Sequence, residues 1–164
     1  MSDCVIPGSF DPVTLGHLDL IRRAAALFEN VTVTVMVNKE KNGCIPYEDR
    51  VRLIRKACGD IPNVKADLWT GLLADYMRQR PDTVVIRGVR NAGEFEKEQT
   101  AAAVNRRLYP GMETLMMPAS EGWNEVSSSA VREIASFGGN FRPFVPGCIY
   151  PELEKWLKSP EKNG

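Results

Sequence analysis

Apolar, β-branched runs alternate with segments of helical period along the whole chain. The runs are typical of strands at residues 4–6, 31–37, 64–69, 83–88 and 113–119. The helical segments cover residues 17–28, 47–58, 71–80, 95–108, 127–135 and 151–158. Parallel neighbouring strands need such crossover helices, and the helices cover the sheet on both sides. The alternation therefore predicts an α/β fold with a doubly wound, five-stranded parallel sheet and helices on both faces.

The length and composition suit one domain with a substantial core. The chain has 164 residues, of which 43% are hydrophobic, and its sequence contains no glycine- and serine-rich linker and no internal repeat. We therefore expect a single domain over residues 1–158, followed by a flexible tail at residues 159–164.

Charge and hydropathy exclude several classes of partner. Lysine plus arginine and aspartate plus glutamate both number 21, so no basic excess favours nucleic acid or an anionic membrane. The N-terminus lacks a secretory signal, and no apolar run of the sequence approaches about 18 residues. We expect a cytoplasmic protein with no nucleic-acid or membrane partner.

The four cysteines do not indicate a metal site. They are scattered, include no CxxC pair, and have one histidine in the chain to join them. We expect no metal ligands from the protein and interpret Cys4 and Cys58 as packing residues.

Two unusual loops follow strands that a doubly wound sheet places side by side. Such sheets bind ligands beyond the carboxyl ends of the strands, at the point where the strand order reverses. The first and fourth strands often lie together at that point. They are followed by PGSFDPVTLGH at residues 7–17 and by RGVR at residues 87–90. We therefore expect both loops to face one crevice.

The first loop has the composition of an anion-binding site. Gly8 and Gly16 allow the backbone to approach a ligand closely. His17 lies where a helix begins, and the exposed N–H groups of a helix N-terminus attract anions. The alternative is a tight turn in which Asp11 or Thr14 caps the helix. The loop is neither GxGxxG nor GxxxxGK[ST], so it does not favour a dinucleotide site or a P-loop.

Further candidates for phosphate contacts follow the other strands. Arg87 and Arg90 directly follow an apolar strand, and guanidinium groups match pairs of phosphate oxygens. The alternative is a surface pair bridged to Glu94, Glu96 or Glu98.

A lysine and three serines lie at the same predicted edge of the sheet. Lys41 follows the second strand and could equally be solvated. The serines at 127–129 follow the fifth strand, where they could cap a helix or hold terminal phosphates. No GxSxG string is present, so they do not indicate a serine nucleophile.

Two of these strings resemble the signatures of a known superfamily. GSFDPVTLGH (residues 8–17) is similar to the [ST]FDPxxxGH signature of the nucleotidyltransferase superfamily, and SSSAVR (residues 127–132) is similar to its second, ISSTxxR-type signature. The RGVR loop, the FEKE helix start and Asn105 resemble the bacterial phosphopantetheine adenylyltransferase family within it. The match runs from the first strand to the C-terminal helix and implies a Rossmann-like form of the fold.

The resemblance implies transfer of the adenylyl group of ATP to 4′-phosphopantetheine, which gives dephospho-coenzyme A and pyrophosphate. It implies Mg²⁺ held mainly by the ATP phosphates, a hexamer of identical chains, and possible feedback binding of coenzyme A. The implied contacts to phosphopantetheine are Ser9, Lys41, Leu73, Arg87 and Asn105. The implied contacts to ATP are Ser9, Phe10, His17, Gly88, Val89, Arg90, Glu98, Trp123, Asn124, Glu125, Val126, Ser127, Ser128 and Ser129.

Catalytic roles carried over from the family fall on His17, Lys41 and Arg90. Two positions depart from the family pattern: Ser9 stands where threonine is common, and Gly71 stands where aspartate is more usual. Two other functions stay open. The chain could transfer an adenylyl or cytidylyl group to another phosphorylated acceptor, or it could be a nucleotide-binding module without catalysis.

Overall fold

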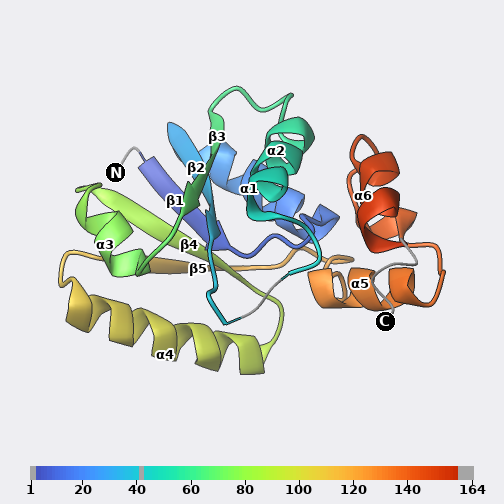
Figure 1. The fold of residues 1–164 in the computed structure, drawn as a ribbon. Helices are drawn as coiled ribbons and strands as arrows, with labels where there is room; N and C mark the ends of the chain where they lie inside the picture. Colours follow the sequence, from blue (N-terminus) through green and yellow to red (C-terminus); the bar gives the residue numbers. More distant parts are fainter. Residues whose placement is uncertain (1–2, 41–42, 159–164) are drawn as a thin grey trace.

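A computed structural model describes residues 3–40 and 43–158 of the chain. Its five strands form one parallel sheet in the order β3-β2-β1-β4-β5 (Figure 1). The strands are β1 Asp3–Gly8, β2 Asn30–Met36, β3 Val64–Trp69, β4 Thr83–Val89 and β5 Thr114–Pro118. The predicted α/β sheet is confirmed, and so is the pairing of the first and fourth strands at the switch point. The expected flexible tail lies outside the described residues.

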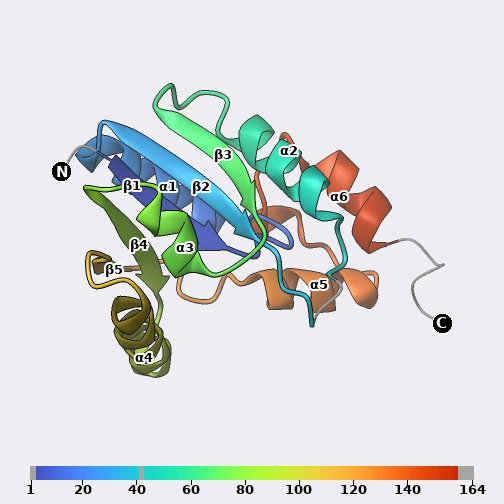
Figure 2. The same cartoon turned by 60° about the vertical axis from the view of Figure 1, so that its left-hand side comes forward.

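Helices cover both faces of this sheet (Figure 2). They are α1 Leu15–Leu27, α2 Tyr47–Ala57, α3 Leu73–Arg78, α4 Ala92–Leu108, α5 Ser128–Ser136 and α6 Tyr150–Leu157, with a short 3-10 helix η1 at Arg142–Phe144. The larger apolar core lies between the sheet and α1, α2, α5 and α6, and the smaller core involves α3 on the opposite face.

Successive side chains along a strand point to opposite faces of the sheet, and so they belong to different cores. Cys4 and Ile6 of β1 belong to the larger core, whereas Val5 between them belongs to the smaller one. Burial raises the pKa of the Cys4 thiol to about 12 and that of the Cys58 thiol to about 11. Both thiols are buried in the larger core, so their interpretation as packing residues is confirmed.

Two helices begin earlier than the sequence predicts, because polar side chains cap them. Thr14 is the N-cap of α1, and its hydroxyl accepts a hydrogen bond from the His17 N–H at 3.3 Å. This places His17 in the first turn rather than at the helix start. Asn91 caps α4 in the same way, since its side-chain oxygen accepts from the Glu94 N–H at 3.0 Å.

Asp11 holds the loop after β1 against the segment before α2. Its two carboxylate oxygens each accept a backbone N–H at 2.9 Å, one from Cys44 and the other from Ile45. The Arg50 guanidinium lies 3.5 Å from the same carboxylate, and it donates to the backbone carbonyls of Ser9 and Ile45. Asp11 is 5% exposed and Arg50 is 3% exposed, so this ion pair is buried. Neither side chain has a buried nitrogen or oxygen without a hydrogen-bond partner.

The start of α5 is attached to the same loop from another direction. The Ser128 hydroxyl donates to the Pro12 carbonyl at 2.7 Å, and Arg132 donates to the Asp11 carbonyl at 2.6 Å. The loop between β1 and α1 is therefore fixed by contacts from both α2 and α5.

We expect Asp11→Asn to lower the free energy of unfolding by about 2–4 kcal/mol, because it leaves the buried Arg50 guanidinium without its counter-charge. Urea unfolding followed by circular dichroism measures this change. Asp60→Asn is the matched control, since Asp60 pairs with Arg22 on the surface and its loss should cost within about 0.5 kcal/mol. Equal effects of the two substitutions would contradict the role assigned to Asp11.

Candidate active site

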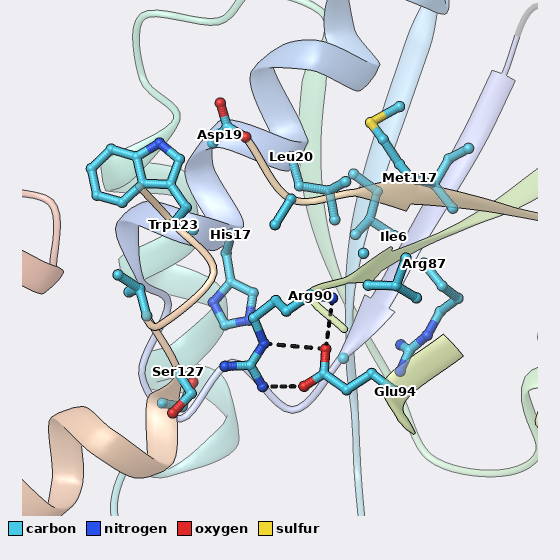
Figure 3. A pocket seen from close by; sticks show the side chains of 18 of the residues that line it. Ile6, His17, Asp19, Leu20, Arg87, Arg90, Glu94, Met117, Trp123 and Ser127 are labelled. Carbon is cyan, nitrogen blue, oxygen red and sulfur yellow. Dashed lines mark hydrogen bonds and ion pairs between the residues drawn. The ribbon is translucent and has the colours of Figure 1, made fainter. Parts of the chain in front are cut away.

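A cavity of about 430 Å³ opens where β1 and β4 end (Figure 3). Its walls come from the loop after β1, the first turns of α1, the end of β4, the first turns of α4 and the segment leading into α5. The structure brings together here the predicted residues Ser9, Phe10, His17, Arg87, Gly88, Val89, Arg90, Glu98, Trp123, Val126, Ser127, Ser128 and Ser129. The expectation that both unusual loops face one crevice is confirmed.

A second cavity of about 280 Å³ lies beside the first, between the sheet edge and α4. Leu73 and Asn105 line it, together with apolar side chains of the sheet and α4. Both cavities are lined by Pro7, Gly8, Ser9, Arg87 and Glu98. The residues expected to contact two different ligands thus line two adjoining cavities that share a wall.

Three predicted site residues are not placed in these walls. Asn124 and Glu125 are exposed and line neither cavity. Lys41 lies outside the described residues.

Sequence reasoning missed several residues of the first cavity that helices contribute. They are Asp19, Leu20 and Arg23 of α1 and Glu94 and Lys97 of α4. The helical period gives a signal for Leu20, which lies three positions after His17 and therefore on the same face of α1.

The imidazole of His17 is oriented by the cap of its own helix. Its Nδ1 accepts a hydrogen bond from the Thr14 backbone N–H at 3.0 Å. Because Nδ1 is an acceptor, we assign the proton of the neutral ring to Nε2. The Phe10 ring packs edge-on against the imidazole, with centroids 4.9 Å apart. Together these contacts fix both the tautomer and the plane of the ring.

The charge state of His17 follows from its surroundings. Burial, with smaller contributions from the nearby charges of Arg90 and Arg87, lowers the pKa of the imidazole to about 4. The ring is therefore neutral near pH 7. It can donate its Nε2 proton in a hydrogen bond to an anion, but it does not supply a full positive charge.

Both arginines of the RGVR loop are paired with carboxylates of α4. The Nε and Nη2 of Arg87 donate to the two oxygens of Glu98 at 2.7 and 2.6 Å. Arg90 donates its backbone N–H at 2.9 Å, its Nε and its Nη2 to Glu94. Burial raises the pKa of Glu94, but the hydrogen bonds from Arg90 outweigh this and hold it below its ordinary value. The two alternatives weighed from the sequence therefore hold together: Arg87 and Arg90 line the cavity and are also paired with Glu98 and Glu94.

The three serines line the first cavity, and Ser127 is the N-cap of α5. The Ser127 hydroxyl accepts from the Ala130 N–H at 3.0 Å, and the Ser129 hydroxyl accepts from Arg132 at 3.2 Å. The Ser128 hydroxyl is directed to the Pro12 carbonyl. The capping role weighed from the sequence is confirmed for Ser127, and the start of α5 faces the cavity.

Local geometry explains the glycine at position 71. Gly71 has φ +138°, a backbone conformation that residues other than glycine rarely adopt. The turn is closed by the Trp69 indole, which donates to the Leu72 carbonyl at 3.0 Å. A Cβ at position 71 would lie 3.3 Å from that indole nitrogen. Glycine therefore allows the turn that leads into α3 and brings Leu73 to the second cavity.

The described residues form neither a metal-binding group nor a membrane-spanning helix. Within residues 3–40 and 43–158, no group of three or more His, Cys, Asp and Glu side chains could hold a metal ion. Over the same residues, none of the helices has the length and apolar character that crossing a membrane requires.

Comparisons with known proteins agree on one family. The family model described as cytidylyltransferase-like matches residues 5–134. The phosphopantetheine adenylyltransferase of Nitrosospira multiformis is 41% identical over 163 residues, which cover 99% of each chain. That of Picosynechococcus sp. is 44% identical over 154 residues, which cover 94% of this chain and 86% of the relative.

Among solved structures, a bifunctional NMN adenylyltransferase/ADP ribose pyrophosphatase from Francisella tularensis has a similar fold. It superposes with a TM-score of 0.73 at 13% identity, over 97% of this chain. The chain spans half of that protein's length, and the likeness concerns the fold alone.

We expect the imidazole of His17 to titrate near pH 4 and to carry its proton on Nε2 at pH 7. Nitrogen-15 NMR of the histidine ring measures both, and the assignment is direct because the chain has one histidine. Since the folded-state pKa lies below the ordinary 6.5, the unfolded chain binds the proton first. This group should therefore lower the stability as pH falls from about 6.5 to about 4. A midpoint near 6.5, or a proton on Nδ1, would contradict the assignment.

Proposed function

The chain belongs to the phosphopantetheine adenylyltransferase family of cytidylyltransferase-like proteins, and from this premise we propose that it transfers the adenylyl group of ATP to 4′-phosphopantetheine. The products are dephospho-coenzyme A and pyrophosphate. The observation that carries the proposal furthest is the pair of cavities with a shared wall at Ser9 and Arg87. Two ligands in these cavities would meet at that wall, as a direct transfer between them requires.

Binding the attacking phosphate is the first task of the site. The phosphate of 4′-phosphopantetheine is already an anion at neutral pH, so it needs no general base. We assign its binding to Arg87 and Lys41, with the Ser9 hydroxyl at the boundary between the cavities. Two nitrogens of Arg87 donate to Glu98 in the structure. An incoming phosphate would replace Glu98 as the acceptor of part of these hydrogen bonds.

Stabilising the charge that develops on the α-phosphate is the second task. His17 donates its Nε2 proton as a hydrogen bond, and the backbone dipoles at the start of α1 add to this. A neutral imidazole suits the role, since no proton has to be removed or delivered during the step. Catalysis then consists of in-line positioning of two phosphates and cancellation of their repulsion.

Holding the leaving pyrophosphate is the third task. We assign it to Arg90 and to the helix start at Ser127–Ser129, all of which line the first cavity. Mg²⁺, which the family resemblance implies, would enter with ATP and take its ligands from phosphate oxygens and water. It would neutralise part of the phosphate charge. The carboxylates that line the first cavity, Asp19, Glu94 and Glu98, each pair with an arginine, and among the described residues they form no metal-binding group.

We further propose a cytoplasmic hexamer that binds coenzyme A as a feedback ligand. An oligomer is supported by α4, all of whose residues are described and none of which is buried. Its Phe95, Val104 and Leu108 are exposed apolar side chains, which a second copy of the chain would cover. Coenzyme A contains both an adenosine group and a pantetheine arm, so it would compete for both cavities.

The proposed activity is tested by supplying ATP, Mg²⁺ and one phosphorylated acceptor at a time and measuring pyrophosphate release. We expect turnover with 4′-phosphopantetheine and a product with the mass of dephospho-coenzyme A. Turnover with nicotinate mononucleotide or a phosphoalcohol instead would identify a different acceptor. ATP binding without release in any mixture would identify a nucleotide-binding module.

We expect His17→Ala to lower kcat by about 100-fold or more, the scale for loss of one preorganised transition-state donor. The KM for ATP should change much less, because the arginines and the serine helix start remain. Steady-state kinetics with both substrates measures the split, and His17→Gln tests whether an amide N–H restores part of kcat. Loss of ATP binding with normal turnover of bound substrate would show that His17 has another role.

A further inference from the structure

The face of α1 that carries His17 continues into the first cavity for two more turns. Asp19, Leu20 and Arg23 line the cavity together with His17. At 1.5 Å per residue, Arg23 lies about 9 Å further along the helix axis than His17. In Figure 3, Asp19 and Leu20 lie on the side of His17 away from Arg90 and Ser127. This end of the cavity is therefore remote from the groups assigned to the phosphates.

Arg23 makes its contacts at this remote end with one guanidinium nitrogen. Its Nη1 donates to the Pro118 carbonyl at 2.7 Å and lies 3.3 Å from the Ser120 hydroxyl. The same nitrogen lies 3.4 Å from a carboxylate oxygen of Asp19, one turn earlier on α1. Asp19 thus orients Arg23, and Arg23 connects α1 to the end of β5.

The segment that Arg23 contacts forms one wall of the cavity. Ala119 is bound to β4 through its N–H, which donates to the Val89 carbonyl at 2.9 Å. Beyond it the chain leaves the sheet and turns twice, with the Trp123 N–H donating to the Ser120 carbonyl and the Val126 N–H donating to the Trp123 carbonyl. Trp123 and Val126 line the cavity. The position of Ser120 therefore influences how far this wall stands from α1.

Arg23 differs from the arginines at the phosphate end. Its Nη1 has three oxygen acceptors within the protein, and Asp19 offsets its charge. Apart from the Asp19–Arg23 pair, the cavity wall on this side includes the apolar side chains Leu20, Met117 and Ala119. A flat, neutral heteroaromatic ring fits this environment better than a phosphate does.

We propose that Arg23, oriented by Asp19, is a positioning residue for the nucleobase. It sets the distance between α1 and the segment 118–126, and so determines which base the remote end of the cavity accepts. This inference rests on the proposed function, because it takes the ligand of the first cavity to be a nucleoside triphosphate whose α-phosphate lies at His17.

The test compares Arg23→Met with Arg22→Met. Arg22 is the neighbouring arginine on α1, but it pairs with Asp60 on the surface and does not line the cavity. We expect Arg23→Met to raise the KM for ATP about tenfold, the scale for losing one or two charge-assisted hydrogen bonds that hold the wall. It should also reduce the preference for ATP over CTP in kcat/KM. The KM for the phosphorylated acceptor should stay within about twofold, because the second cavity is untouched.

Two further variants separate positioning from a general loss of structure. Arg23→Lys keeps one donor and should recover part of the ATP affinity, and Asp19→Asn, which keeps Arg23, should give an intermediate KM for ATP. Urea unfolding checks that each variant is folded. If folded Arg23→Met matches Arg22→Met in ATP KM and in base preference, the proposal is wrong. If the wild-type protein turns over no acceptor, the proposed function has failed, and direct ATP binding by the same two variants still decides the role of Arg23.

Discussion

The geometry of the site depends on one buried carboxylate, that of Asp11. It accepts two backbone N–H groups from the segment before α2 and faces the buried guanidinium of Arg50. Arg50 in turn holds the Ser9 carbonyl, and α5 binds the carbonyls of Asp11 and Pro12. Residues on either side of Asp11 are therefore fixed from three directions. Phe10 and His17, which pack against each other at the cavity, take their positions from this arrangement.

A second constraint is that a site for two anions must be stable without them. The chain satisfies it by pairing each arginine of the RGVR loop with a glutamate of α4, and by keeping His17 neutral. An unpaired, partly buried guanidinium would be costly, whereas an exchange of a carboxylate for a phosphate replaces one charge-assisted interaction with another. The carboxylates also hold Arg87 at the shared wall and Arg90 at the first cavity. The proposed role of α4 is thus to hold the cationic groups as well as to line the second cavity.

The sequence predicted those features that depend on period and on loop composition. The β-α alternation predicted the parallel sheet, and the strings at residues 7–17 and 87–90 predicted the crevice between the first and fourth strands. Arg23 and Glu94 could not be found in this way, because a polar residue on a cavity-facing helix side has the same period as one facing solvent. The sequence also could not predict which ring nitrogen of His17 carries the proton. That position depends on the hydrogen bond from the Thr14 N–H to Nδ1, which forms because Thr14 caps α1. Asn124 and Glu125 were carried over with their neighbours, but a run in sequence does not keep all its side chains on one surface.

The lining of the second cavity bears on the choice of acceptor. Near the shared wall it offers Arg87 and Ser9, and further away Leu73, Val85 and Met112 make it largely apolar. Asn105 and Thr114 add two polar groups. A nucleotide acceptor would bring a base and a ribose with many hydrogen-bonding groups, and burying these against apolar side chains is unfavourable. The thin arm of phosphopantetheine has a branched dimethyl carbon near the phosphate, one hydroxyl, two amides and a terminal thiol, which matches a lining with few polar groups. The balance of the second cavity therefore favours the pantetheine acceptor over a mononucleotide for physical reasons that are independent of sequence identity.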